Sequence, residues 1–155
     1  MALHKEKGYR ALRRGRVSEP GRVYFVTTAC DHRKPWFADW NVAHAVCALH
    51  AAPGAFLDAE PLAWVLMPDH WHALLSLNDG APLSTVLQHF KARSARAANG
   101  VLGRSGAIWQ RGFHERALRQ DDDLRAAARY LIANPVRANL VHRVGDYPYW
   151  NCIWL

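Results

Sequence analysis

Two histidines separated by one residue form the most distinctive chemical pattern in the sequence: His70-Trp71-His72, directly after Pro68-Asp69. Pro68-Asp69 predicts a turn, and residues 70–77 predict a strand. Because side chains alternate along a strand, His70 and His72 should share one face, whereas Trp71 points to the other and can pack under a helix. Two imidazoles on a rigid strand can bind a metal ion if a third ligand supports them. The alternative is two unrelated surface histidines, in a chain that contains nine.

A tyrosine and an asparagine four residues apart form a second pattern, Tyr130 and Asn134, followed by Pro135. In a helix this spacing places both on one face, at the flank of an apolar stripe. A tyrosine at a cleft edge can act as a nucleophile, and an amide oxygen can bind a metal ion. The alternative is a half-buried structural tyrosine with an Asn cap at the end of the helix.

The net charge of +7 is unevenly distributed, because two basic blocks flank residues 37–87, which hold five acidic residues and no Lys or Arg. Basic blocks often face phosphates, so nucleic acid is the favoured partner, with a solvated Arg-rich surface as the alternative. His114 is either a DNA contact or proton-transfer residue, or a surface histidine. The other candidate DNA contacts are cations: Arg13, Arg14, Arg16, Lys91, Arg93, Arg96 and Arg111.

The elements that must position these residues follow from periodicity and turn signals. We expect strands over residues 22–28, 56–66 (bent near Pro61), 70–77 and 109–119, and helices over residues 41–52, 82–100 and 121–134. The first six elements, in the order strand, helix, strand, strand, helix, strand, predict an α+β fold with an antiparallel sheet and helices on one face. We divide the chain into a basic arm (1–20), one domain (21–143) and an aromatic tail (144–155), which could pack back, stack on bases or cover the site.

Composition excludes several classes of protein. The sequence has no apolar run of 18 residues, so no membrane partner is expected, and its basic N-terminus lacks an apolar signal core. The three cysteines are scattered and form neither a disulfide framework nor a metal-ligand spacing, which favours a reducing cytoplasm and argues against a zinc-binding structural domain.

Taken together, the two patterns resemble a known family. Pro68-Asp69-His70-Trp71-His72, followed about sixty residues later by Tyr130-x-x-x-Asn134-Pro135, is similar to the single-tyrosine HUH transposases. Four further features resemble the REP-associated tyrosine transposase branch: the basic arm, the strand Arg22–Thr28, the segment Trp109–His114 and the run Asn134–Ala138. The resemblance extends from about Arg13 to Val141. It implies the HUH endonuclease fold, a ferredoxin-like antiparallel sheet sandwich with a C-terminal catalytic helix.

The resemblance also implies roles for individual residues. Tyr130 would be the catalytic nucleophile, and His70, His72 and Asn134 would bind a divalent metal ion, Mg²⁺ or Mn²⁺. The implied activity is that of a single-strand DNA endonuclease and strand transferase, which acts at DNA hairpins through a 5′-phosphotyrosine intermediate. We expect single-stranded or hairpin DNA as partner, no small-molecule cofactor beyond the metal, and a monomer, with a homodimer as the alternative. The rival functions are a non-catalytic hairpin-binding protein and a metal-dependent phosphoesterase that uses water.

Overall fold

The computed structural model describes residues 22–78, 82–119 and 123–155, and its central feature is an antiparallel sheet of five strands in the order β4-β1-β3-β2-β5. The strands are β1 (Val23–Ala29), β2 (Ala59–Met67), β3 (His70–Leu77), β4 (His114–Ala117) and β5 (Trp150–Cys152). The first four strands and the helices between them have the order of a ferredoxin-like sandwich, so the predicted fold class is confirmed. Arg13, Arg14 and Arg16 lie outside the described residues.

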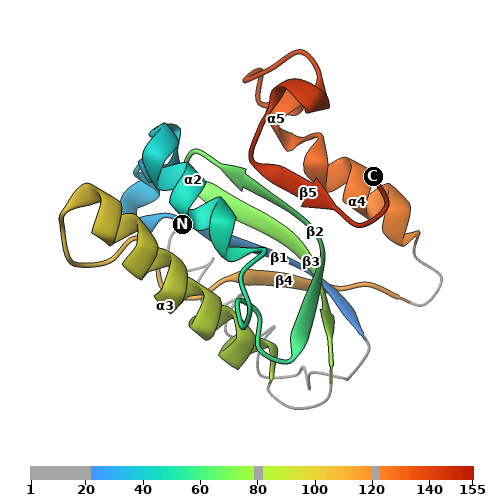
Figure 1. The fold of residues 1–155 in the computed structure, drawn as a ribbon. Helices are drawn as coiled ribbons and strands as arrows, with labels where there is room; N and C mark the ends of the chain where they lie inside the picture. The colour runs from blue at the N-terminus through green and yellow to red at the C-terminus, as the bar shows by residue number, and fades with distance from the viewer. Residues whose placement is uncertain (1–21, 79–81, 120–122) are drawn as a thin grey trace, which may run out of the picture.

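Two helices cover one face of the sheet, α2 (Trp40–Leu49) and α3 (Leu83–Leu102), and they contact each other (Figure 1). The core between them and the sheet includes Trp71 and Phe90, whose rings stack with their centroids 4.2 Å apart. Trp71 is fully buried, as the alternation along residues 70–77 predicts.

A third helix, α4 (Leu124–Ile132), packs on the opposite face, mainly against β2, and the short helix α5 (Asn134–Arg137) follows it (Figure 1). Asp123 caps the N-terminus of α4, because its Oδ1 accepts hydrogen bonds from the backbone N–H groups of Arg125 and Ala126. The predicted apolar stripe of α4 forms the second core with residues of β2 and β3, among them Val65, Met67 and Leu74. Within the described residues, no helix is long and apolar enough to cross a membrane.

Several predicted boundaries are wrong. The second helix of the sandwich runs past Asn99-Gly100 and ends at Gly103, whose left-handed backbone (φ 63°) caps it with a hydrogen bond to the Asn99 carbonyl. The strand predicted over residues 109–119 is reduced to His114–Ala117, because Gly112 has a positive φ of 77° and Trp109 forms only an isolated bridge with Cys30. The bend near Pro61 is confirmed as a register shift between Pro61 and Ala63.

The aromatic tail contributes a strand that was not predicted, β5, which pairs with the free edge of β2. Upstream of β5, Tyr147 is buried and donates its phenol hydrogen to the Leu66 carbonyl, with an O–O distance of 2.6 Å. The Leu66 N–H in turn donates to the carbonyl of Tyr149. The sequence left three roles open for the tail: packing back onto the fold, stacking on bases or covering the site. The structure shows the tail packed back onto the fold.

Candidate functional site

The two histidines of the predicted metal pair begin β3, and each imidazole is held through Nδ1. Nδ1 of His70 lies 2.7 Å from Asp69 Oδ1, and Nδ1 of His72 lies 2.7 Å from Thr27 Oγ1 on the neighbouring strand. A carboxylate only accepts, so the proton of neutral His70 lies on Nδ1 and leaves the Nε2 lone pair available. The rings lie edge to face, with centroids 4.7 Å apart. Both rings can therefore present Nε2 to a shared ligand.

Arg33, which the sequence did not single out, extends this arrangement. Its Nε donates to Asp69 Oδ2 at 3.0 Å, and its backbone is left-handed (φ 54°), as is that of His32. Partial burial alone would raise the pKa of Asp69, but the hydrogen bond from His70 and the charge and hydrogen bond of Arg33 together hold it below its usual value. Asp69 is therefore an anion that orients His70.

The surroundings of His72 keep its imidazole neutral. Burial, followed by coulombic interactions with His70, Arg137 and Arg33, lowers the pKa of His72 to about 3. A neutral imidazole is the form that binds metal ions. Arg137, the last residue of α5, is among the charges that lower this pKa.

Tyr130 lies on α4, the helix that covers the histidine-bearing face, because His70, His72 and Leu74 share the side of β3 that packs toward α4. Its side chain is 61% exposed, so core packing does not explain a tyrosine at this position. The guanidinium of Arg137 lies over the Tyr130 ring, with Cζ 3.9 Å from the ring centroid. Arg137 thus stacks on the candidate nucleophile while its charge acts on a candidate metal ligand.

Asn134 begins α5 rather than ending the helix of Tyr130, since α4 stops at Ile132 and Ala133 lies between them. Its Nδ2 donates to the Leu131 carbonyl at 2.8 Å, which fixes the amide and leaves Oδ1 as an acceptor. Among the described residues, no group of three or more His, Cys, Asp and Glu side chains could hold a metal ion, so a third protein ligand for the histidine pair would have to be of another type.

His114 lies next to this site by strand register. On β4 it pairs with Thr27 of β1, which pairs in turn with His72 of β3, so the three side chains share one face. Two strand spacings separate His114 from His72, roughly 10 Å. Arg116, two residues further along β4, is exposed and on the same face. This half of the face has exposed cationic and imidazole groups, and α4 packs on the other half.

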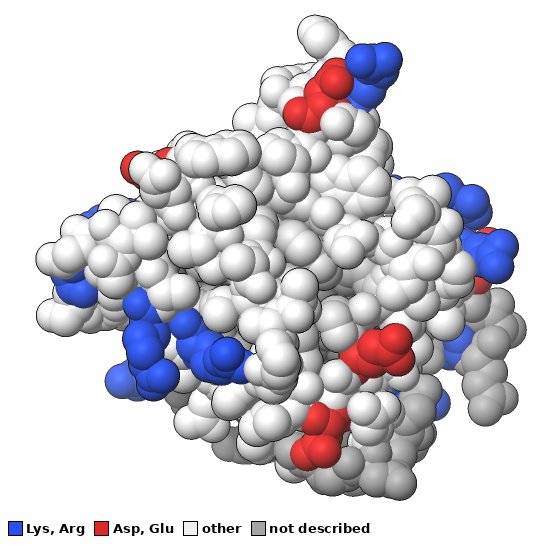
Figure 2. Space-filling model, in the orientation of Figure 1, with Lys and Arg blue, Asp and Glu red and all other residues white. Residues whose placement is uncertain are grey.

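The predicted DNA-binding residues of α3 lie on the other side of the sheet from the histidines. Lys and Arg side chains gather over α3 in Figure 2, whereas the middle of that view is largely uncharged. Arg93 contacts the Pro53 carbonyl, and Arg96 lines a shallow groove with Asn99 and Arg104. Lys91 instead fastens a loop, donating to the carbonyls of Gln110 and Gly112 at 2.7 and 2.8 Å.

Arg111 lies in that loop, exposed, just before β4. The structure therefore does not gather Lys91, Arg93, Arg96 and Arg111, the predicted cations that it describes, into one patch around the histidines. Those of α3 occupy the helical layer, and of the predicted DNA contacts that the structure describes, only His114 shares the histidine-bearing face.

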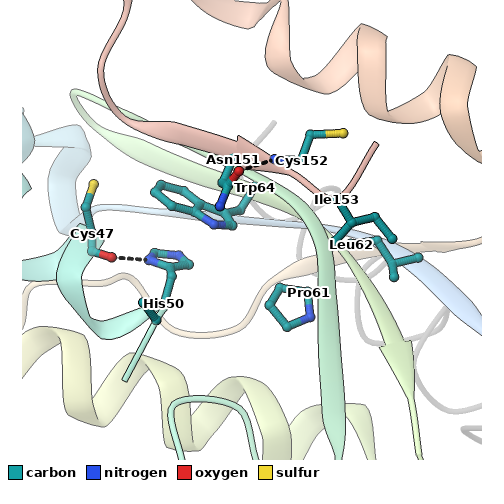
Figure 3. Close-up of a pocket in the computed structure, with 9 residues that line it drawn as sticks. Cys47, His50, Pro61, Leu62, Trp64, Asn151, Cys152 and Ile153 are labelled. Atoms are coloured by element: carbon teal, nitrogen blue, oxygen red, sulfur yellow. Dashed lines mark hydrogen bonds between the residues drawn. The ribbon is translucent and has the colours of Figure 1, made fainter. Parts of the chain in front are cut away.

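A second hollow, of about 210 Å³, lies between α2, β2 and β5 (Figure 3). Within it, the His50 ring stacks on Trp64 with centroids 3.7 Å apart. His50 Nε2 accepts from the indole N–H of Trp71 at 3.0 Å, and Nδ1 lies 3.2 Å from the Cys47 carbonyl, so both ring nitrogens are occupied. Burial lowers the pKa of His50 to about 4. His50 is thus a core residue rather than a catalytic base.

We expect the free energy of unfolding to fall in acid because of the titration of His50. Its folded pKa of about 4 lies below the ordinary value of about 6.5, so the unfolded chain takes up a proton first as pH falls. The free energy of unfolding should be fully present above pH 6.5 and fall by about 2–3 kcal/mol by pH 4.5 through this residue. Urea unfolding at both pH values should show a smaller acid loss in His50→Gln than in the native protein.

The exposed residue His142 supplies the control, because His142→Gln should keep the native acid loss. His72 has a lowered pKa as well, but it is present in all three proteins and cancels in the comparison. An acid loss in His50→Gln equal to that of the native protein would contradict the assignment.

Comparisons with known proteins bear on the family and the fold of this chain. The family model described as "Transposase IS200 like" matches residues 22–134. A REP-associated tyrosine transposase of Escherichia coli (strain K12) is 33% identical over 88 residues, which are 56% of this chain and 50% of that protein. A putative REP-associated tyrosine transposase of Haemophilus influenzae is 35% identical over 100 residues, covering 58% of this chain and 57% of that protein. The chain thus spans about half the length of the curated relatives that it matches.

Among solved structures, a REP-associated tyrosine transposase bound to a REP hairpin superposes with a TM-score of 0.64 at 26% identity. The match covers 87% of this chain and 79% of that one. The family match includes both histidines, Tyr130 and Asn134, and the solved structure shares the fold described above. The resemblance inferred from the sequence is confirmed: the chain belongs to the IS200-like transposase family.

Proposed function

We propose that this protein is a metal-dependent single-strand DNA endonuclease and strand transferase. It acts at DNA hairpins, and Tyr130 becomes covalently linked to the 5′-phosphate of the cut strand. The relatives named as REP-associated tyrosine transposases, one of them bound to a REP hairpin, support the hairpin as substrate. We further propose that one chain completes the site as a monomer.

One observation carries the proposal. Two histidines whose Nδ1 atoms are already bonded lie on the face that α4 covers, and Arg137 acts on both His72 and the exposed ring of Tyr130. An exposed phenol that stacks with a cation, on a helix packed against the face that carries two oriented imidazoles, suits phosphoryl transfer to a tyrosine. A purely structural tyrosine would not need the cation on its ring.

The donor set fits a divalent metal ion. Nε2 of His70, Nε2 of His72 and Oδ1 of Asn134 are nitrogen and oxygen donors that Mg²⁺ or Mn²⁺ accepts, and three protein ligands leave positions for the substrate. A bound ion would polarise the scissile phosphate and stabilise its developing negative charge. Asp69 and Thr27 hold the two imidazoles in place, and Asn134 is oriented by its bond to Leu131.

The chain's own residues account for the bond changes. The Tyr130 oxygen forms a bond to phosphorus while the bond from phosphorus to the 3′-oxygen breaks. The phenol loses its proton to water, and the 3′-oxygen leaves as a hydroxyl. The phosphotyrosine conserves the energy of the phosphodiester, so the reverse reaction can join a new 3′-hydroxyl. His114 and Arg116, exposed on the same face, are the candidate contacts for the DNA backbone there.

The direct experiment uses the native protein with Mn²⁺ and a hairpin oligonucleotide that has single-stranded flanks and a label at its 3′ end. Cleavage should leave a labelled protein–DNA adduct that survives denaturing electrophoresis, and mass spectrometry of its tryptic peptides should locate the DNA on Tyr130. Chelation of the metal should prevent adduct formation. Cleavage without an adduct would favour the phosphoesterase, and binding without cleavage would favour a non-catalytic hairpin-binding protein.

We predict that Asp69→Asn weakens Mn²⁺ binding about tenfold or more, because the amide is a weaker acceptor for the His70 Nδ1–H and no longer fixes the ring. Isothermal titration with Mn²⁺ measures the change. Asp146→Asn, which removes an exposed carboxylate paired with Arg143, is the control and should bind as the native protein does. Equal Mn²⁺ affinities for all three proteins would contradict the role of Asp69.

A further inference from the structure

Arg137 differs from the other cations near the site in what it contacts. Arg33 is paired with Asp69, and Lys91 is held by backbone carbonyls. Arg137 lies over the Tyr130 ring at 3.9 Å, and within residues 22–78, 82–119 and 123–155 no carboxylate forms an ion pair with it. Its charge therefore has no anionic partner in the described part of the chain.

In the part of the chain that the structure describes, no group accepts a hydrogen bond from the guanidinium of Arg137. A guanidinium that lies on an aromatic ring uses its face, and its five N–H groups point outward in the plane, where they match two oxygens of a phosphate. The backbone that carries the guanidinium is fixed, because Arg137 ends α5, its N–H donates to the Ala133 carbonyl at 3.0 Å, and Pro135 of the same short helix is buried. The guanidinium is thus held beside the phenol before DNA arrives.

We propose that Arg137 is a catalytic residue that binds the non-bridging oxygens of the scissile phosphate and directs Tyr130 at its phosphorus. The inference rests on the proposed function. When the bond from Tyr130 to phosphorus forms and the bond to the 3′-oxygen breaks, negative charge accumulates on those oxygens, and the fixed guanidinium stabilises it without losing its own proton.

A kinetic comparison tests the rate effect. Single-turnover adduct formation with Mn²⁺ should fall about 100-fold or more in Arg137→Ala, with partial retention in Arg137→Lys, which keeps the charge but not the planar fork. Arg125→Ala removes an exposed arginine of α4 and should keep the native rate. Thermal unfolding of each variant shows whether the fold is intact. A folded Arg137→Ala variant within threefold of the native rate would overturn the proposal.

A binding cycle tests contact with the phosphate independently of chemistry. Native protein and Arg137→Ala are titrated, with chelator present, against hairpins carrying either a phosphate or a neutral methylphosphonate at the scissile position. If Arg137 touches that phosphate, the two losses of affinity should be non-additive by at least about threefold. Additive losses would mean that Arg137 only supports the Tyr130 ring and would overturn the proposal. Because this cycle needs no cleavage, it remains informative even if the native protein forms no adduct.

Discussion

Tyr130→Phe should abolish the protein–DNA adduct, lowering its rate of formation at least a thousandfold, while hairpin binding changes less than about threefold. The large effect follows from removal of the attacking oxygen, for which no neighbouring group can substitute. The fold should survive, because the ring is 61% exposed and phenylalanine keeps the face on which Arg137 lies. Denaturing electrophoresis of labelled hairpin with Mn²⁺ measures the adduct, and fluorescence anisotropy with chelator measures binding.

The matched control is Tyr149→Phe, which removes a phenol outside the proposed site. Tyr149 contacts Tyr147 edge to face and belongs to the packing around β5, so this variant should form the adduct at the native rate. If Tyr130→Phe still forms an adduct, another residue is the nucleophile. If Tyr130→Phe cuts the hairpin at the native rate and leaves no attached protein, water is the nucleophile and the phosphoesterase is the correct function.

Trp71→Ala should lower the free energy of unfolding by about 3–5 kcal/mol, the range for removal of a buried large aromatic side chain. Trp71 is fully buried, stacks on Phe90, and donates its indole N–H to His50. The substitution therefore opens a cavity between β3 and α3 and leaves a buried imidazole nitrogen without its donor. Urea unfolding at pH 7 measures the change.

Trp40→Ala is the control for this prediction, because Trp40 is 59% exposed at the start of α2. Its removal should cost less than about 1 kcal/mol. Since Trp71 lies between His70 and His72 in sequence, its burial also fixes which face of β3 the two histidines occupy. A Trp71→Ala variant as stable as Trp40→Ala would show that this core does not hold the strand in register.

The features that the sequence predicts correctly depend on local periodicity. Alternation along residues 70–77 predicts that His70 and His72 share one face of the strand. The apolar stripe of α4 likewise predicts which side of that helix is buried. The turn at Pro68-Asp69 separates two strands in register, with Met67 opposite His70. In each case the deciding interactions lie within a few residues, so a single segment contains the information.

Boundaries and the tail strand depend on longer contacts. Gly100 is a reasonable cap by composition, but the helix continues to Gly103, where the backbone becomes left-handed. The segment Trp150–Cys152 has no clear strand pattern of its own and becomes β5 because the edge of β2 offers unpaired backbone groups. Where a helix ends and whether a segment forms a strand depend on which other parts of the chain lie beside it. Short-range sequence patterns do not contain that information.

By itself, the sequence determined the chemistry available to this protein: a histidine pair on a strand, a tyrosine on a helix, and a family in which the two belong together. Only the tertiary structure decided which residues support them. It brought Thr27 to His72 across 45 positions and Arg33 to Asp69 across 36, and it placed the α3 cations in the layer away from the histidines. It also laid Arg137 on Tyr130. These contacts arise from the packing of distant segments, which no local periodicity records, and they turn candidate residues into an oriented site.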